Sequence, residues 1–324
     1  MRTTHLTHRI RFMVAAACAA ALSLFMLPAV SAQGTMTQTA TSTQRDTRTW
    51  HVRVGEETAH QAIQGMAFLP GTIWINAGDR ITWTANSGEI HTVTFLATGQ
   101  SLKPFDPFDP NQLRPRGGSH YDGRSYYNSG IMSSDEAPVL PAWRSYTLTF
   151  DKTGTFTYWC LVHGVMMKGV VHVRPEGTSY PFSQGQYDRR SALHAQRIFA
   201  DGWRLWVSTA LRATSRTSFF GADDGVAMVM RFIRPTSRVR VGQTVTWRNV
   251  GMAAPHTVTF GPERANIFVP YGDPTHFSGG QLNSGIVTPG GSFTVRFTKA
   301  GTYPYICALH DNLGMVGTVI VSGA

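Results

Sequence analysis

The sequence predicts an all-β protein made of two tandem β-sandwich domains, which are joined by a connector containing an amphipathic helix. From residue 50 onward, short runs of β-branched and aromatic residues alternate with Gly, Pro and Asn, as is typical of a sandwich or barrel. A set of sequence landmarks then occurs twice in the same order, which indicates a tandem duplication. At 324 residues the chain is long enough for two domains, each with its own core.

The N-terminal residues predict an export signal followed by a flexible spacer. Residues 1–32 have a basic start with Arg2, Arg9 and Arg11, continue in an apolar run and end in small residues suited to cleavage. An uncleaved anchor is the alternative. Residues 33–50 are rich in Thr, Gln and Ser and predict the spacer. Removal of the signal lowers the net charge from +10 to +7, and the scattered Lys and Arg residues indicate no nucleic-acid footprint.

Five paired landmarks define the duplication. They are GDRITW and GQTVTW (78–83 and 242–247), HTVTF (91–95 and 256–260), NSGI (128–131 and 283–286), KTGTF and KAGTY (152–156 and 299–303), and a Cys/His/Met segment (160–169 and 307–317). They place the two domains at residues 51–174 and 227–324. Between its first His and its Cys the first copy carries 18 extra residues, around 105–110, which predict a surface excursion.

The connector, residues 175–226, breaks the β pattern. Residues 191–213 predict an amphipathic helix, weakened by Gly202, because apolar residues recur at near-helical spacing: Leu193, Phe199, Trp203, Trp206 and Ala210. We expect this helix to pack against one or both β domains. Docking to a partner or to a membrane surface is the alternative, and membrane contact is expected only through this helix or an uncleaved signal.

The two Cys/His/Met segments predict metal sites. Each sets a thiolate at the end of a predicted strand, followed two residues later by His and then by Met. Thiolate, imidazole and a weak axial thioether suit copper, whereas protein zinc sites seldom use Met. The donors read from the sequence are Cys160 and His163 with the upstream His91, and Cys307, His310 and Met315 with the upstream His256. A disulfide between the two cysteines is the alternative, which their matching contexts disfavour.

These segments resemble the cupredoxins, the blue (type 1) copper proteins. The resemblance implies two Greek-key sandwiches with one type 1 copper each, two per chain, and it implies the ligands His91, Cys160, His163 and Met167, and His256, Cys307, His310 and Met315. In the first copy Met166 is the alternative axial ligand. An azurin-like loop, with Lys-Gly after the Met, selects Met167, whereas the shorter amicyanin spacing selects Met166. Met167 is preferred because the next strand's Gly then keeps its place in both copies.

The resemblance favours an electron carrier over an enzyme. Copper enzymes with such domains place His beside the Cys or in His-x-His pairs, and neither pattern occurs near Cys160 or Cys307. We expect an exported protein, periplasmic or extracellular, that transfers electrons between a donor and an acceptor protein. The resemblance implies His163 and His310 as the points where electrons enter or leave. The alternatives are a copper storage or delivery protein, and a copper enzyme like nitrite reductase or laccase with an unrecognised second metal site, for which His120 and His276 are candidate residues.

Overall fold

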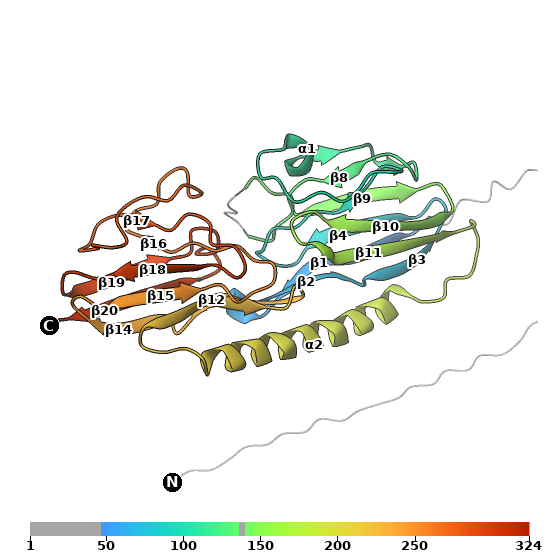
Figure 1. Cartoon of the computed structure of the whole chain (residues 1–324). Coiled ribbons are helices and arrows are strands. Elements are labelled where there is room, and N and C mark those ends of the chain that lie inside the picture. Colours follow the sequence, from blue (N-terminus) through green and yellow to red (C-terminus); the bar gives the residue numbers. More distant parts are fainter. Residues whose placement is uncertain (1–46, 136–139, 324) are drawn as a thin grey trace, which may run out of the picture. The chain divides into compact units, whose positions relative to one another are not determined.

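Each repeat folds into a β-sandwich, and a long helix separates the two in the sequence, so the predicted fold class is confirmed (Figure 1). The computed structural model describes residues 47–135 and 140–323, which belong to one structural unit. The predicted export signal and most of the predicted spacer lie outside the described residues. The first domain is defined here as strands β1 to β11 and the second domain as strands β12 to β20.

The first domain pairs two sheets, and its surface excursion carries a short helix. Its strands are β1 (Thr49–Glu57), β2 (Ile63–Leu69), β3 (Thr72–Asn76), β4 (Arg80–Ala85), β5 (Thr94–Phe95), β6 (Pro115–Arg116), β7 (His120–Tyr121), β8 (Tyr127–Ser129), β9 (Ser145–Phe150), β10 (Gly154–Cys160) and β11 (Gly164–Arg174), with a 3-10 turn η1 (Ala59–Gln61) and the helix α1 (Pro110–Leu113). One sheet has the order β2-β1-β4-β9-β7 and the other β3-β11-β10-β5-β8-β6.

The second domain repeats this plan with fewer strands. They are β12 (Thr217–Asp223), β13 (Ala227–Ile233), β14 (Thr236–Arg240), β15 (Thr244–Arg248), β16 (Thr259–Phe260), β17 (Leu282–Asn283), β18 (Ser292–Arg296), β19 (Gly301–Ile306) and β20 (Val316–Ser322). One sheet has the order β13-β12-β15-β18 and the other β14-β20-β19-β16-β17. Strand β12 lies within the residues assigned to the connector from the sequence, and it pairs with β13 and β15 as β1 pairs with β2 and β4.

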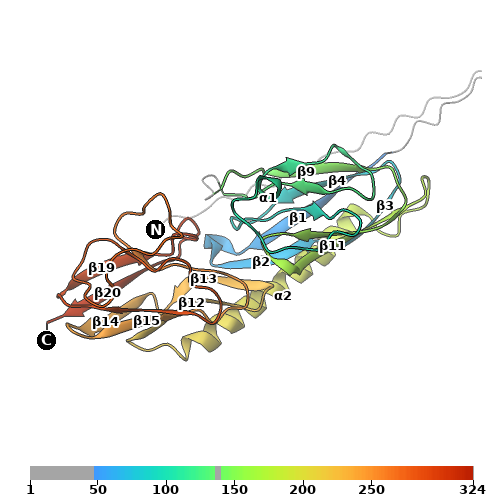
Figure 2. The ribbon, with the colours of Figure 1, turned by 45° about the horizontal axis from the view of Figure 1, so that its top comes forward.

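The two domains share one continuous sheet. Strand β2 pairs antiparallel with β13 through Ile63–Val229, Gln64–Met228 and Gly65–Ala227 (Figure 2). This pairing joins the five-stranded sheet of the first domain to the four-stranded sheet of the second, which gives one sheet of nine strands. Strands β2 and β13 hold equivalent places in the two repeats. Antiparallel pairing of equivalent strands is the arrangement of a two-fold symmetric dimer, here within one chain.

Each domain has an aromatic core built from equivalent residues. In the first, the side chains of Ile81 and Trp83 alternate inward along β4, as a half-buried strand requires. Trp83 packs edge-on against Tyr158 with ring centroids 5.3 Å apart, and its counterpart Trp247 packs on Tyr305 at 5.0 Å. Burial of such large rings supplies much of the hydrophobic stabilisation of each sandwich.

The connector helix α2 (Gln184–Ala210) starts earlier and ends earlier than predicted. Ser183 caps it with Gln186 in a reciprocal capping box, which the sequence prediction overlooked. The prediction that the helix packs against one or both β domains is confirmed, because it contacts β1 and β2 of the first domain and β12 and β13 of the second. Gly202 allows close approach, because a Cβ there would lie 2.4 Å from the Ile63 side chain.

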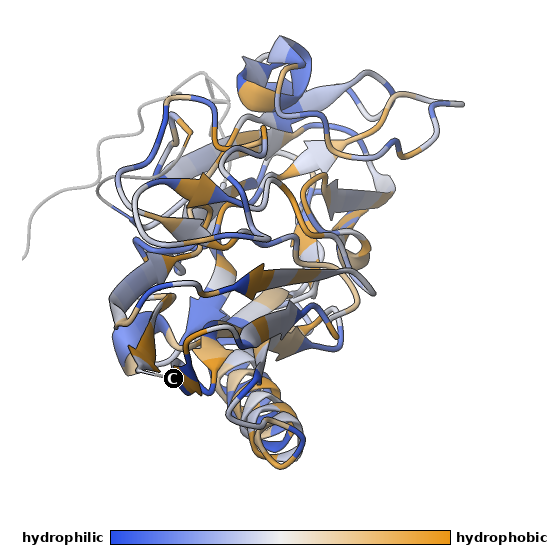
Figure 3. Ribbon diagram, turned by 60° about the vertical axis from the view of Figure 1, so that its left-hand side comes forward, coloured by the Kyte–Doolittle hydropathy of each residue, from blue (hydrophilic) through white to orange (hydrophobic). Residues whose placement is uncertain are grey.

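The apolar stripe of α2 differs from the predicted one. The buried positions include Tyr187, Ala195 and Ile198, whereas Leu193 and Trp203 are exposed. Figure 3 shows α2 carrying both hydrophilic and hydrophobic residues. The buried face of the helix includes the small residues Ser191, Ala195 and Gly202, and Phe199 and Trp206 of the predicted stripe pack beside it partly buried. Among residues 47–135 and 140–323, no helix is long and apolar enough to cross a membrane.

Candidate metal centres

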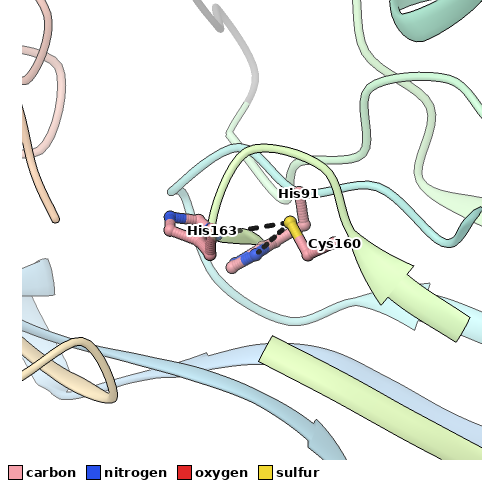
Figure 4. Close-up of side chains that lie close together, drawn as sticks. All are labelled: His91, Cys160 and His163. Carbon is pink, nitrogen blue, oxygen red and sulfur yellow. Dashed lines mark hydrogen bonds between the residues drawn. The ribbon is translucent and has the colours of Figure 1, made fainter. Parts of the chain in front are cut away.

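The first site lies where two loops of the first domain meet. Cys160 ends β10 and His163 ends the turn between β10 and β11, while His91 lies in the loop before β5. Cys160 Sγ lies 3.9 Å from His91 Nδ1 and 3.3 Å from His163 Nδ1 (Figure 4). The three donor atoms all lie within 4.8 Å of one another. The structure therefore brings together three of the four donors proposed from the sequence.

The second site repeats this geometry. Cys307 Sγ lies 3.7 Å from His256 Nδ1 and 3.4 Å from His310 Nδ1. The fourth predicted donor, Met315, is fully buried in the same hydrophobic cluster as Cys307, and its carbonyl accepts the N–H of Cys307 at 3.0 Å. Both cysteines are free, so the disulfide alternative does not apply.

Of the two candidate axial methionines in the first site, Met167 is buried and Met166 is not. Met167 is 1% exposed and shares a hydrophobic cluster with Cys160, whereas Met166 is 40% exposed. The glycine two residues after Met167 is Gly169, and its counterpart after Met315 is Gly317. Both glycines pair with the corresponding tyrosine of the preceding strand. This shared register supports Met167 as the equivalent of Met315.

The repeated HTVTF motif holds each sulfur in place. The backbone N–H of Thr92 points at Cys160 Sγ at 3.3 Å, and the hydroxyl oxygen of Thr92 accepts the N–H of Leu161 at 2.8 Å. In the second domain the N–H of Thr257 points at Cys307 Sγ at 3.4 Å, and its hydroxyl oxygen accepts the N–H of Ala308 at 2.8 Å. An N–H directed at sulfur stabilises a thiolate.

The family and sequence comparisons agree with two copper-binding repeats. A sequence profile described as copper binding proteins, plastocyanin/azurin family, matches residues 55–174 and 220–322, one match for each repeat. The chain belongs to this family. It is 35% identical over 114 residues to the chloroplastic plastocyanin of Tetradesmus obliquus, covering 35% of this chain and 72% of that protein. It is also 35% identical over 104 residues to the plastocyanin of Scenedesmus fuscus, covering 31% and 93%. Among solved structures it is 27% identical to a Cu(I) amicyanin variant, covering 35% and 89%, with a TM-score of 0.23.

The donor set suits the copper that this family binds. Two imidazole nitrogens and a thiolate, with a buried thioether in the same cluster, are the ligand types of a blue-copper centre. Burial lowers the pKa of His163 to about 3 and that of His310 to about 4. It also raises the pKa of both thiols to about 11. The imidazoles are therefore neutral and ready to bind a metal, and metal binding must release a proton from each thiol.

The repeated NSGI motif supports the loop that carries the upstream His in each domain. In the first domain Ser129 Oγ accepts the N–H of Val93 at 2.8 Å, and Asn128 Oδ1 accepts the hydroxyl of Thr94 at 2.9 Å. The second domain repeats both bonds through Ser284 and Asn283, at 2.8 and 3.0 Å. The NSGI landmark thus supports the sites without supplying a donor, whereas HTVTF supplies both a donor histidine and a supporting threonine.

Two carboxylates that the sequence prediction overlooked also hold these loops. Glu57 Oε2 accepts the N–H of Gly88 at 2.8 Å in the first domain. Asp223 Oδ1 accepts the N–H groups of Met252 and Ala253, at 2.8 and 3.0 Å, in the second. Each carboxylate lies two residues after an equivalent glycine of β1 or β12. Extending the repeat alignment upstream of its first landmark would have revealed the pair.

The residues around the two pairs of histidines differ. Ser87 Oγ lies 2.9 Å from His91 Nε2, whereas the ring of His256 stacks on Phe220 with centroids 5.6 Å apart. His310 Nε2 lies 3.6 Å from a carboxylate oxygen of Glu89, which belongs to the first domain. Burial raises the pKa of Glu89 to about 7. Residues that contact the ligands in this way set the orientation of the ligands and the reduction potential of the metal.

His310, which the resemblance implies as a point where electrons enter or leave, is 6% exposed. Leu313, from the same loop, packs in the hydrophobic cluster of the first domain. His163 is partly buried, and its loop carries the exposed residues Val165 and Met166. Burial is the main cause of the low pKa of His163, and the charge of His310 contributes to it.

The two further candidate histidines, His120 and His276, pair with exposed carboxylates rather than with either metal site. His120 Nδ1 pairs with Asp151 at 2.6 Å and His276 Nδ1 lies 3.4 Å from Asp273, both on the surface. In the part of the chain that the structure describes, the two His/Cys/His sets are the groups of three or more donors close enough to hold a metal.

Proposed function

We propose that this chain is an exported blue copper protein that binds two type 1 copper ions and transfers electrons between redox partner proteins. One observation carries the proposal: the same buried set of two Nδ1 atoms and one Sγ atom occurs twice, each with a threonine N–H directed at the sulfur. Bound copper supplies one-electron chemistry between Cu(I) and Cu(II). The proposed ligands are His91, Cys160, His163 and Met167 in the first site, and His256, Cys307, His310 and Met315 in the second.

The protein's part is to hold these donors in place before the metal arrives. The sulfurs are anchored at strand ends by hydrogen bonds from the neighbouring loop, and the imidazoles are neutral. Preorganised donors need little rearrangement when the charge of the site changes, which favours rapid electron transfer. The surrounding hydrophobic clusters exclude water from both sulfurs.

The positions of the downstream histidines support electron exchange between the two sites. His310 of the second site lies 3.6 Å from Glu89, two residues before the first-site ligand His91, and the domains are fixed by the shared β2–β13 pairing. External partners would then dock at the His163 loop, where Val165 and Met166 offer an exposed apolar surface. The proposed route runs from this surface through the first site to the second.

Neither alternative function has comparable support. A storage or delivery protein needs donors that a partner can reach, whereas both cysteines here are fully buried. An enzyme needs a substrate-activating metal, and within residues 47–135 and 140–323 no third donor cluster accompanies the two described above.

Copper analysis with visible and EPR spectra tests the proposal. We expect two coppers per chain with intense thiolate-to-copper absorption, and one copper in Cys160→Ala or Cys307→Ala. Potentiometric titration is expected to give two midpoints, because the outer residues of the sites differ. A third copper or a type 2 signal would support the enzyme instead. Binding of Cu(I) without a stable blue form would support storage.

Export is tested separately by N-terminal sequencing of the protein produced with its full leader. We expect the mature chain to start at Gln33, after the small residues 30–32. A full-length, membrane-associated product would favour the uncleaved anchor.

A further inference from the structure

The second site receives a side chain from the first domain. Glu89 lies in the loop between β4 and β5, two residues before the first-site ligand His91. One of its carboxylate oxygens lies 3.6 Å from Nε2 of His310, which belongs to the second site. Both side chains are only 8% exposed. A buried carboxylate at this distance from a ring nitrogen interacts electrostatically, because little water screens the pair.

The contact lies in a fixed part of the domain boundary. Leu313, from the same loop as His310, belongs to the hydrophobic cluster of the first domain. A Cβ on Gly88 would lie 2.6 Å from the Leu313 side chain, so the two loops are in close contact. The guanidinium of Arg231 donates to the carbonyls of Leu313, at 2.5 Å, and His60. The loop of the second site is therefore held against the first domain at several points.

The two repeats are not equivalent here. The residue two positions before the upstream His is Glu89 in the first repeat and Ala254 in the second. Ala254 is buried in the cluster of the first domain, and its methyl group offers no acceptor. At this equivalent position, the first repeat offers a carboxylate to the opposite site and the second repeat does not, although the repeats are related by the pairing of equivalent strands.

The orientation of His310 gives this carboxylate a role. Nδ1 of His310 faces Cys307 at 3.4 Å, which leaves Nε2 to face Glu89. A metal-binding histidine commonly directs its other ring N–H to a carboxylate, which fixes the tautomer and the ring orientation. A negative charge near the metal also stabilises its more positive oxidation state.

We propose that Glu89 is a positioning residue for the second copper site, which fixes His310 with Nδ1 free for the metal and lowers the reduction potential of that site. The inference rests on the proposed function for its second part, the effect on the potential. Its first part concerns the tautomer of His310 and applies to the copper-free protein as well.

The potential is best measured where only the second site can form a blue centre, in the Cys160→Ala background. There Glu89→Gln removes the charge at nearly constant volume, and Glu89→Ala removes the acceptor as well. We expect both to shift the Cu(II)/Cu(I) equilibrium of the second site at least tenfold toward Cu(I), an increase in potential of about 59 mV. Glu89→Ala should also alter the EPR spectrum of the site, because His310 loses its partner.

Asp135→Asn is the matched control. Asp135 also reaches across the domain boundary, where it accepts a hydrogen bond from Asn312, and it is not a neighbour of a ligand in the sequence. This variant should leave the potential and the spectrum of the second site unchanged. An equal shift in Asp135→Asn, or no shift in either Glu89 variant, would overturn the effect on the potential.

The tautomer is tested without copper, by long-range ¹H–¹⁵N NMR of the histidine rings. We expect His310 to carry its proton on Nε2 in the unsubstituted protein and to populate both tautomers in Glu89→Ala. A tautomer that is unaffected by Glu89→Ala would refute the positioning role. If the tautomer changes as expected but no blue copper binds in the Cys160→Ala background, the proposed function fails while the positioning of His310 stands.

Discussion

The ring of Tyr158 lies over the α-carbon of Gly169, its partner across the β10–β11 ladder. A Cβ at Gly169 would lie 2.2 Å from the ring carbon Cζ. Because Gly169 lies two residues after Met167 in β11, the contact with the tyrosine fixes the β10–β11 register next to the irregularity at Cys160. Tyr305 and Gly317 repeat the relationship after Met315. The register of each axial methionine is thus tied to a buried aromatic ring.

Substitution of Gly169 is expected to destabilise the first domain. In Gly169→Ala the added methyl group must displace the buried ring of Tyr158, and overpacking of this kind costs about 1–3 kcal/mol. The measurement is the urea unfolding midpoint. Gly118→Ala is the control, because a Cβ there meets nothing within 4 Å. Equal midpoints for the two variants would contradict the close contact.

The choice of axial ligand is tested by two leucine substitutions. Met167→Leu should raise the potential of the first site and change its visible spectrum, since it removes a buried thioether at nearly constant volume. The stability cost should stay below about 1.5 kcal/mol. Met166→Leu should leave both properties unchanged, because Met166 lies on the surface. The reverse outcome would assign Met166.

The Asp223 carboxylate is expected to stabilise the loop that carries His256. Asp223→Ala leaves the N–H groups of Met252 and Ala253 without their acceptor, which should lower the free energy of unfolding by about 1–3 kcal/mol. Copper affinity at the second site should fall with it, as measured by competition with a chelator. Asp188→Ala, on the exposed face of α2, is a suitable control. Unaltered stability in Asp223→Ala would show that the loop does not depend on this residue.

The copper-free protein should lose stability in acid. Burial holds the pKa of all four site histidines below 6.5, so the unfolded chain binds more protons than the folded one once the pH falls below that value. The stability that the neutral histidines contribute is fully present above about pH 6.5. It declines as the pH falls toward the pKa that each histidine has in the folded protein, about 4 for His310 and about 3 for His163. The loss is up to about 1.4 kcal/mol per pH unit for each histidine.

The effect of Glu89 on stability has the opposite pH dependence and offsets the contribution of about one of the four histidines. Burial raises the pKa of its carboxyl from 4.5 to about 7, so in that range it favours folding as the pH falls. The net expectation is a lower urea midpoint at about pH 5 than at about pH 7. A midpoint that stays constant or rises in acid would contradict neutral buried histidines.

Copper removal should lower the thermal unfolding midpoint. A ligand that binds only the folded chain at a thousandfold excess over its dissociation constant stabilises it by about 4 kcal/mol. Calorimetry with and without copper measures the effect, and Cys307→Ala should lose the contribution of the second site alone. If Cys307→Ala gained as much from copper as the unsubstituted protein, the two sites would not be separate.

The sequence determined the fold class, the duplication and the candidate donors, because these depend on patterns that are local or repeated. Strand periodicity reports burial directly, and the spacing Cys-x2-His brings both groups into one short loop. The repeated motifs also contain Thr92, Thr257, Asn128 and Asn283, although the sequence did not show that these residues form hydrogen bonds around the sites.

Only the tertiary structure decided how the repeats are joined. The β2–β13 pairing consists of backbone hydrogen bonds between segments over 150 residues apart, and backbone groups carry no residue-specific signature. The His310 loop lies against the first domain, so this ligand of the second repeat is buried beside Glu89 of the first. A carboxylate that reads as an ordinary loop residue in the sequence thereby becomes the neighbour of a ligand in the other repeat.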